Sequence, residues 1–336
     1  MNISEYFKPK SLVYTGKHAS VKTQVIHYLY DENTLRIQDD FEPIQGLKSY
    51  IQVIGFSDVE YIQSIRKYYS MDTLVLEDIF NVNQRNKIEV VKDTIFGTFH
   101  IEYLLNRVIH GDYMSIWMDS NTIITFHETE PVFLNPLKKL FTEHQELRAK
   151  TVDYLFFQIL DIITDNHLDV YDQLDSEVNQ FENDILETKN IEQEEFYLLR
   201  KFMLNLKNHV SPVLEHLNQI ISKKSSMFKE DNLPYFDDLK DHLVRLDGRL
   251  DRSRELMRHL LDLHMNNQSN KMNKIMATLT LFSAIFIPLS FLTGFFGMNF
   301  VHFGILKYEH AVIGFAILCI LIIVGMVWYF KKKKWF

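Results

Sequence analysis

Cysteine is almost absent from this sequence. Cys319 is the only one among 336 residues, so no disulfide can form within the chain, which excludes a disulfide-rich secreted domain. Glycine and proline are also scarce, at 11 and 7 residues, which excludes collagen-like and low-complexity chains. With 46% hydrophobic and 24% charged residues, the composition is that of a folded protein of about two or three domains.

Signatures of common enzyme classes are missing as well. No two histidines are four residues apart, as a zinc-protease helix requires, and no Gly-x-x-x-x-Gly-Lys-Ser/Thr loop is present for a nucleoside triphosphate. No nucleophile and base motif accompanies the single cysteine. The net charge of −8 argues against a nucleic-acid partner. We therefore expect a protein that is not an enzyme and does not bind nucleic acid.

Charge is absent from two long segments near the C-terminus. Residues 275–306 and 311–330 contain no Asp, Glu, Lys or Arg. A bilayer core of ~30 Å requires about 20 apolar helical residues, and both segments are long enough. A buried core helix is the alternative, but such helices rarely extend this far without a charge. The pattern predicts two membrane-spanning helices.

The distribution of lysines predicts the orientation of these helices. Lys271 and Lys274 precede the first segment, four lysines follow the second at 331–334, and only Lys307 lies between them. Because basic flanks stay inside, both termini are expected in the cytoplasm of a cell (inner) membrane protein. The first ten residues have no apolar stretch, so we expect no signal peptide.

The rest of the chain changes from strand-like to helical periodicity. Short segments rich in Ile, Val and aromatics between residues 20 and 130 are typical of strands, whereas apolar residues after 131 recur every three or four positions. Apart from Gly248 and the polar run at 266–270, no turn signal separates the last helical pattern from the first apolar segment, so one long stalk helix is expected. We predict helices at 57–69, 151–187, 194–225 and 236–274, and a hairpin that joins 113–118 to 122–127.

These patterns predict six parts along the chain. The fold class is an α/β cytoplasmic domain with acidic helices, a long stalk helix and two C-terminal transmembrane helices. Residues 151–190 hold ten acids and one base, and this face is either simply solvated or attracts cations. The expected parts are a cytoplasmic domain 1–234, a stalk 235–274, a first span 275–299, an outer loop 300–310, a second span 311–330 and a basic tail 331–336.

The most specific sequence signal lies at the end of the first span. Gly-Met-Asn occupies 297–299, Leu-Glu-Asp-Ile occupies 76–79, and Lys-Lys-Lys-Lys-Trp stands near the end of the chain. Together they closely resemble the CorA family of magnesium and cobalt transporters. The resemblance implies a funnel-shaped homopentamer in the lipid bilayer, whose first spans line the pore. The sequence departs from the family in the loop after the motif, where the Met-Pro-Glu stretch that is common in the family is missing.

The resemblance also implies the pore residues. Gly297, Met298 and Asn299 would form the selectivity filter. The serines agree with this independently, because polar groups in a span are better placed facing water than lipid. A helix contact face is the alternative for any single residue. The implied pore-lining residues are Asn273, Met276, Leu279, Ser283, Ile287 and Ser290.

The implied function is uptake of Mg²⁺, with Co²⁺ also carried. Mg²⁺ dehydrates reluctantly, and a ring of amides and hydroxyls can bind its hydration shell instead of stripping it. The membrane potential supplies ~2.3 kcal/mol per charge per 100 mV, so no nucleotide is needed. Regulatory Mg²⁺ would bind carboxylates at subunit interfaces, which the resemblance assigns to Asp78 and Asp238 with Glu77 beside them. Ordinary surface acids are the alternative.

Two other functions stay open from the sequence. A relative tuned to zinc, nickel or cobalt is one, and His302 and His310 in the loop would suit softer metals unless they are only solvated. A membrane-anchored sensor without a pore is the other, but it would need neither a polar face nor Asn299. An intact Gly-Met-Asn favours magnesium among these.

Overall fold

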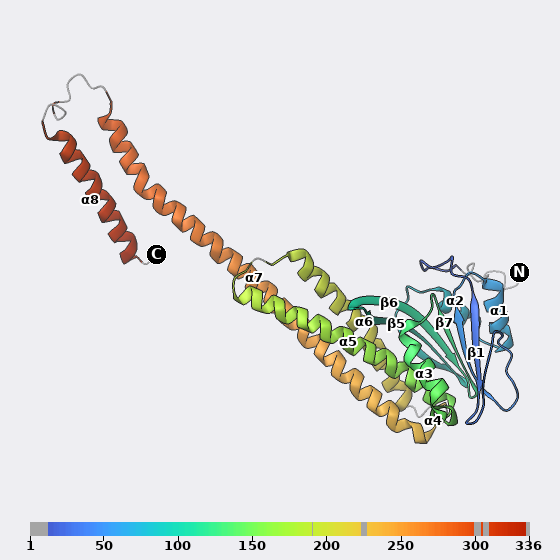
Figure 1. Ribbon diagram of the computed structural model, residues 1–336. Helices are drawn as coiled ribbons and strands as arrows, with labels where there is room; N and C mark the ends of the chain where they lie inside the picture. The colour runs from blue at the N-terminus through green and yellow to red at the C-terminus, as the bar shows by residue number, and fades with distance from the viewer. Residues whose placement is uncertain (1–12, 190, 223–226, 299–303, 305–308, 334–336) are drawn as a thin grey trace, which may run out of the picture. The chain divides into compact units, whose positions relative to one another are not determined.

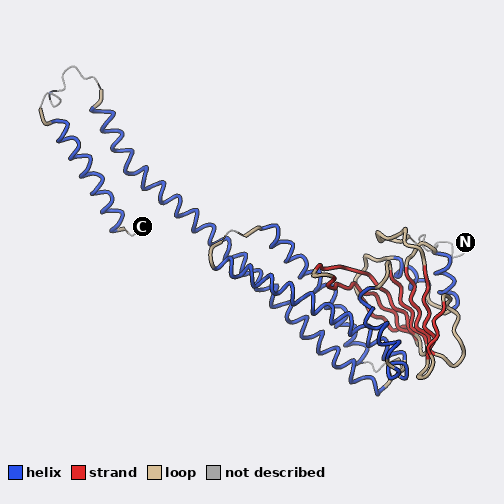
Figure 2. Tube along the Cα trace, viewed as in Figure 1, coloured by secondary structure: helices blue, strands red, loops and turns tan. Residues whose placement is uncertain are grey.

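The computed structural model describes residues 13–189, 191–222, 227–298, 304 and 309–333. The chain divides into two units, Met1–Arg258 and His259–Phe336. The first holds a β-sheet and long helices, whereas the described part of the second is helical (Figures 1 and 2).

A seven-stranded sheet lies at the centre of the first unit (Figure 2). Its strand order is β2-β1-β3-β7-β6-β5-β4. All neighbours are antiparallel except β3 and β7, which run parallel and pair Ser49 with Thr122 at one end and Ile54 with His127 at the other. The strands are β1 Gln24–Tyr30, β2 Leu35–Gln38, β3 Lys48–Ile54, β4 Lys87–Val91, β5 Thr94–Leu105, β6 Val108–Met118 and β7 Thr122–His127.

The predicted hairpin is confirmed by the pairing of β6 with β7, in which Met118 lies opposite Ile123. The carboxylate of Asp119 holds its turn, because it accepts hydrogen bonds from the backbone N–H groups of Asn121 and Thr122 at 2.8 and 2.7 Å. Asp in a turn commonly binds the backbone two residues ahead in this way. The strand β6 begins at Val108, earlier than the sequence pattern indicated.

A second hairpin, between β5 and β6, was not predicted. Its two-residue turn consists of Asn106 and Arg107, with φ of 53° and 64°. Two consecutive residues with positive φ make the type of turn whose twist matches that of paired strands. Arg at the second position is not a usual signal for it, which is why the sequence pattern missed the turn.

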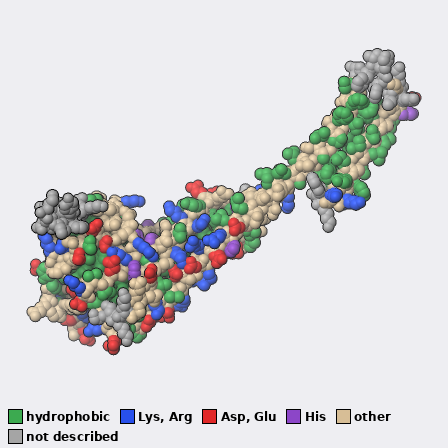
Figure 3. Space-filling model, turned by 180° about the vertical axis from the view of Figure 1, so that it is seen from behind, with side chains coloured by type: hydrophobic (Ala, Val, Ile, Leu, Met, Phe, Trp, Pro, Cys, Tyr) green, Lys and Arg blue, Asp and Glu red, His purple; other side chains and the backbone are tan. Residues whose placement is uncertain are grey.

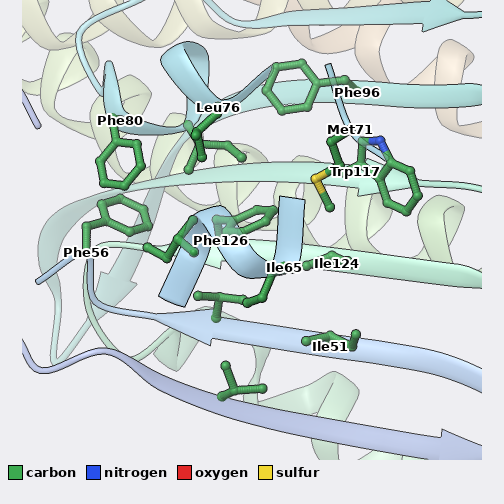
Figure 4. Close-up of a cluster of buried hydrophobic side chains, with 14 of the residues drawn as sticks. Ile51, Phe56, Ile65, Met71, Leu76, Phe80, Phe96, Trp117, Ile124 and Phe126 are labelled. Carbon is green, nitrogen blue, oxygen red and sulfur yellow. The ribbon is translucent and has the colours of Figure 1, made fainter. Parts of the chain in front are cut away.

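Two short helices cover one face of the sheet, α1 Val59–Tyr68 and α2 Thr73–Phe80. Asp58 and Asp72 cap them by accepting hydrogen bonds from the backbone N–H groups of Tyr61 and Leu74, each at 2.9 Å. Figure 4 shows the buried cluster beneath them, which combines residues from both helices with residues from β3, β5, β6 and β7. The labelled members are Ile51, Phe56, Ile65, Met71, Leu76, Phe80, Phe96, Trp117, Ile124 and Phe126.

Longer helices follow the sheet. The predicted helical segments agree with α5, α6 and the first part of α7, which continues without a break toward the Gly-Met-Asn motif as the sequence indicated. The ring of Phe141 in α3 packs on Tyr30 of the sheet, with ring centroids 4.7 Å apart. The helix bounds are α3 Asn135–Glu143, α4 Gln145–Ala149, α5 Val152–Leu186, α6 Gln193–Ser222, α7 Leu233–Phe296 and α8 Ala311–Lys332, with short 3-10 helices at Val132–Leu134 and Glu230–Asn232.

The start of α7 is bound to the start of α5 through a buried carboxylate. Asp153 accepts hydrogen bonds from the backbone N–H of Lys229 and from the side-chain amide of Asn232, each at 2.9 Å. The same amide also donates to the hydroxyl of Thr151 at 2.9 Å. Because Asp153 is only 4% exposed, its carboxylate loses water on folding, and these hydrogen bonds replace those that it made to the water.

The second unit contains the end of α7 and all of α8. Both helices are long and apolar enough to cross a membrane by length and composition, and their apolar windows are not buried. The rings of Phe296 and Phe315 pack with their centroids 5.2 Å apart. In Figure 3 the hydrophobic side chains gather over this unit, whereas charged side chains of both signs cover the helices of the first unit.

Candidate functional site

The predicted pore-lining residues all lie on the second half of α7, which extends from Leu233 to Phe296. Helical geometry places side chains three and four residues apart on one face. The apolar members are well exposed, with Met276 at 58%, Leu279 at 66% and Ile287 at 67%. An exposed apolar face of this kind fits a lipid or a neighbouring helix better than water. The set as predicted is Asn273, Met276, Leu279, Ser283, Ile287 and Ser290, and each member is exposed.

The helix ends at the predicted filter. The N–H of Gly297 donates to the carbonyl of Thr293 at 2.9 Å, which closes the final turn. A Cβ at position 297 would come within 2.9 Å of that carbonyl oxygen, so only glycine fits without a shift. Met298 is 55% exposed, and Asn299 lies outside the described residues.

The predicted regulatory carboxylate Asp78 is already paired. The ammonium of Lys87 lies 2.7 Å from its Oδ2 and 3.1 Å from Glu89, and both side chains of the first pair are largely covered. Partial burial lowers the pKa of Lys87, but hydrogen bonds to Asp78 and Glu89 outweigh this and raise it. Glu77, the predicted companion, is exposed. A cation that binds Asp78 would therefore compete with Lys87.

Asp238, the other predicted regulatory residue, lies on the exposed surface of α7. Its carboxylate is 3.9 Å from Nε2 of His242, one turn further along the helix. Within the described residues, Glu77, Asp78 and Asp238 do not form one cluster of metal ligands. The resemblance places such residues at contacts between subunits, which a single chain does not contain.

A different cluster does have the spacing of metal ligands. Asp161 and Asp165 on α5 and His242 on α7 present ligand atoms that all lie within 4.8 Å of one another. Burial raises the pKa of both carboxyls; the charge of Asp165 also raises that of Asp161, and His242 opposes the shift in each. Crowded carboxylates of this kind are stabilised by a bound cation.

Sequence reasoning missed this cluster as a site. The signal was present in part, because Asp161 and Asp165 are one helical turn apart in the acidic segment that was interpreted as solvated or cation-attracting. Only the packing of α7 against α5 brings His242 to them. The oxygen ligands suit Mg²⁺, and the imidazole adds affinity for Co²⁺ or Zn²⁺.

A second group of titratable residues is buried where the sheet meets α5 and α6. Glu102 of β5 lies 3.1 Å from Nε2 of His167 and 2.5 Å from Nδ1 of His209. Burial by itself would raise the pKa of Glu102, but the two imidazoles hold it well below its usual range. The ring of His100 stacks on His209 at 4.7 Å between centroids. This group joins three elements and has no feature of a transport path.

Comparison with known proteins gives a consistent result. The family described as "CorA-like Mg2+ transporter protein" matches residues 56–332. A curated relative, the "Cobalt/magnesium transport protein CorA" of Thermotoga maritima, is 26% identical over 97% of this chain and 96% of its own. The "Zinc transport protein ZntB" of Photorhabdus laumondii is 26% identical over 66% of this chain and 67% of its own. The solved structure of the CorA magnesium transporter from Methanocaldococcus jannaschii has the same fold, with a TM-score of 0.79 and 18% identity over 94% of this chain and 100% of that one.

Proposed function

This chain belongs to the family of CorA-like Mg²⁺ transporter proteins, and we propose that it is a channel for Mg²⁺ uptake that also carries Co²⁺. The membership makes it a divalent-metal transporter with two membrane-spanning helices rather than an enzyme. The observation that carries the choice of Mg²⁺ is the intact Gly-Met-Asn at 297–299, at the end of the first span. The relative from Thermotoga maritima supports the choice of Mg²⁺, because it is named a cobalt and magnesium transport protein and matches this chain over nearly its whole length.

The proposed assembly is a homopentamer. Two helices of one chain cannot enclose a pore, so the path must form between copies arranged as a ring. The exposed polar positions Asn273, Ser283 and Ser290 on α7 support a lining of first spans. The apolar composition of α8 is that of a helix in contact with lipid.

The proposed filter binds a hydrated ion. Five copies of Asn299 would present carbonyl oxygens that accept hydrogen bonds from the water shell of Mg²⁺. Rings of Met276, Leu279 and Ile287 below it would form an apolar constriction that closes by dewetting. No carboxylate lies between 275 and 306 to trap a divalent ion. With both termini in the cytoplasm, the inside-negative membrane potential drives the ion inward.

The proposed regulation uses carboxylates of the first unit. Asp78 with Glu77 on one subunit and Asp238 on the next would hold Mg²⁺ and stabilise the closed ring. The cluster of Asp161, Asp165 and His242 lies on α5 and α7, and Asp238 is also on α7. The charge of Asp238 contributes to the raised pKa of Asp161. A cation bound at Asp238 or in the cluster would relieve the repulsion between Asp238 and Asp161.

Flux into liposomes tests the proposal. Protein in vesicles with an internal Mg²⁺ indicator should show uptake under an inside-negative potential, and Asn299→Ala should abolish it. Thr278→Ala is the matched control, because Thr278 lies on the same helix on the side opposite the predicted pore face, and its hydroxyl donates to the carbonyl of Lys274 at 2.8 Å. Equal uptake by Asn299→Ala and the wild-type protein would refute the filter.

Zinc is the second candidate cargo. The imidazole of His242 beside two carboxylates and the match to a zinc transport protein favour it. If the same vesicles take up Zn²⁺ at concentrations at which they take up no Mg²⁺, Zn²⁺ replaces Mg²⁺ as the proposed cargo. Mg²⁺ flux that Co²⁺ competes with, and that Zn²⁺ does not exceed, would support the first proposal.

A further inference from the structure

A small cavity lies between α6 and α7 in the first unit. Its volume is about 60 Å³. Arg200, Met203, Leu204 and Lys207 line it from α6 at the spacing of one helical face, and Leu250, Arg254 and Met257 line it from α7 in the same way. Met203, Leu250 and Met257 are at most 3% exposed and form an apolar floor. Three of the lining residues are cationic, Arg200, Lys207 and Arg254.

One of these cations has its charge balanced and two do not. The ammonium of Lys207 lies 2.6 Å from Asp251 and 3.4 Å from Asp247, which joins the two helices. For Arg200 and Arg254, the described part of the chain provides no hydrogen-bond or ion-pair partner, although both residues line the same cavity. Like charges brought together across a helix pair repel, so this arrangement favours an anion between them.

The size and chemistry of the cavity restrict the anion. At about 60 Å³, the space admits only a compact anion of a few heavy atoms, such as a phosphoryl group. Guanidinium groups match such an oxyanion through paired N–H donors. The apolar floor keeps water from one side and so strengthens the attraction. We propose that Arg200, Arg254 and Lys207 bind a phosphoryl group between α6 and α7, from either a soluble phosphate-bearing anion or a lipid headgroup.

The consequence of binding would be a stronger connection between the two helices. Lys207 already bridges them, and a bound oxyanion would add bonds from Arg200 on α6 and Arg254 on α7. Because α7 also carries the predicted pore residues, the site would make the stability of this helix pair respond to phosphate. This proposal does not depend on the identity of the transported ion.

Phosphate binding to the full-length protein tests the proposal. Protein purified in detergent without added lipid or divalent metal is titrated with sodium phosphate, against sodium chloride at equal ionic strength. The thermal unfolding midpoint and the ³¹P NMR linewidth report binding. We expect a saturable rise of the midpoint and line broadening in the wild-type protein. The double variant Arg200→Gln with Arg254→Gln should bind phosphate at least about tenfold more weakly.

The matched control removes the same charge from the same helices. Lys201 and Arg252 are exposed and do not line the cavity, so Lys201→Gln with Arg252→Gln should retain the phosphate response. Should the first double variant fail to fold, Arg254→Lys keeps the charge but loses the paired donors, and its affinity should be intermediate. Equal loss in both double variants would overturn the proposal, and so would the absence of any response beyond that to chloride in detergent together with no response to phosphatidylglycerol.

Lipid nanodiscs distinguish the two sources of the phosphoryl group. A response to orthophosphate in lipid-free detergent identifies a soluble anion. A midpoint that instead rises only in phosphatidylglycerol nanodiscs, and not in phosphatidylcholine ones, identifies a headgroup, provided that the Arg200→Gln and Arg254→Gln double variant loses it. If the double variant keeps the rise of the unfolding midpoint in phosphatidylglycerol nanodiscs, the result counts against the site.

Discussion

The ammonium of Lys87 at the start of β4 lies 2.7 Å from the carboxylate of Asp78 in α2. The pair joins a strand to the helix that carries the Leu-Glu-Asp-Ile segment, and each side chain is less than a quarter exposed. A regulatory cation at Asp78 must therefore share or displace an internal cation of the same chain. If Asp78 holds the proposed regulatory Mg²⁺, Lys87 would set the concentration at which the ion acts there.

Removal of this lysine should tighten regulation by Mg²⁺. In Lys87→Gln, the Mg²⁺ concentration that half-protects the protein from proteolysis should fall by about fivefold, since a partly exposed ion pair is worth roughly 1 kcal/mol. Lys139→Gln, an exposed lysine on α3, is the control and should leave the midpoint unchanged. Weaker Mg²⁺ protection in Lys87→Gln would contradict the competition.

Asp161→Asn should raise the stability of the protein without metal but reduce the stabilisation that metal provides. Without divalent ions the variant should be more stable by about 0.2–0.5 kcal/mol, because Asp161 and Asp165 are like charges one helical turn apart. With Mg²⁺ or Co²⁺, the metal-dependent rise in thermal midpoint should be largely lost. Glu182→Gln on the same helix is the control. A full metal response in Asp161→Asn would exclude the cluster as a cation site.

Acid should destabilise the first unit through His127. The imidazole is buried in β7, where Nε2 lies 2.9 Å from the Thr125 hydroxyl, and burial lowers its pKa to about 3. In the unfolded chain the imidazole of His127 binds a proton with a pKa near 6.5, whereas in the folded chain it binds one only near pH 3. Between these values stability therefore falls as pH falls, by up to about 1.4 kcal/mol per pH unit.

Unfolding by denaturant between pH 7 and 5 measures this dependence. His127→Gln should show a shallower loss of unfolding free energy with acid than the wild-type protein, whatever its stability at pH 7. His144→Gln changes an exposed histidine and should keep the wild-type slope. Identical slopes in all three proteins would show that His127 is not responsible.

Asp153→Ala should weaken the connection between α5 and the start of α7. It leaves the N–H of Lys229 and the amide of Asn232 without their buried acceptor, at a cost of about 2–4 kcal/mol. Asp153→Asn keeps one acceptor oxygen and should lose less. Hydrogen exchange at the first turn of α7 and denaturant unfolding measure both, with exposed Asp231→Ala as control. Equal losses of unfolding free energy in the Ala and Asn variants would show that the hydrogen bonds of Asp153 are not the cause.

The long elements were determined by the sequence alone. The helices α5, α6 and α7 and the two apolar segments follow from spacing and length, which are local properties of consecutive residues. The continuity of α7 past residue 274 was predicted because only Gly248 and the polar run at 266–270 interrupt the helical pattern. The Gly-Met-Asn motif indicated the family together with its position relative to both spans and with the Leu-Glu-Asp-Ile and lysine-rich segments, all of which are visible in the sequence.

The tertiary structure decided which distant residues meet. The parallel pairing of β3 with β7 joins strands about 70 residues apart, and no local pattern specifies it. His242 joins Asp161 and Asp165, and His167 and His209 join Glu102, only because α5, α6, α7 and the sheet pack together. Periodicity predicts the face of an element that a side chain occupies. Its partner on another element depends on packing between segments far apart in the chain, and the candidate cation site arises at that level.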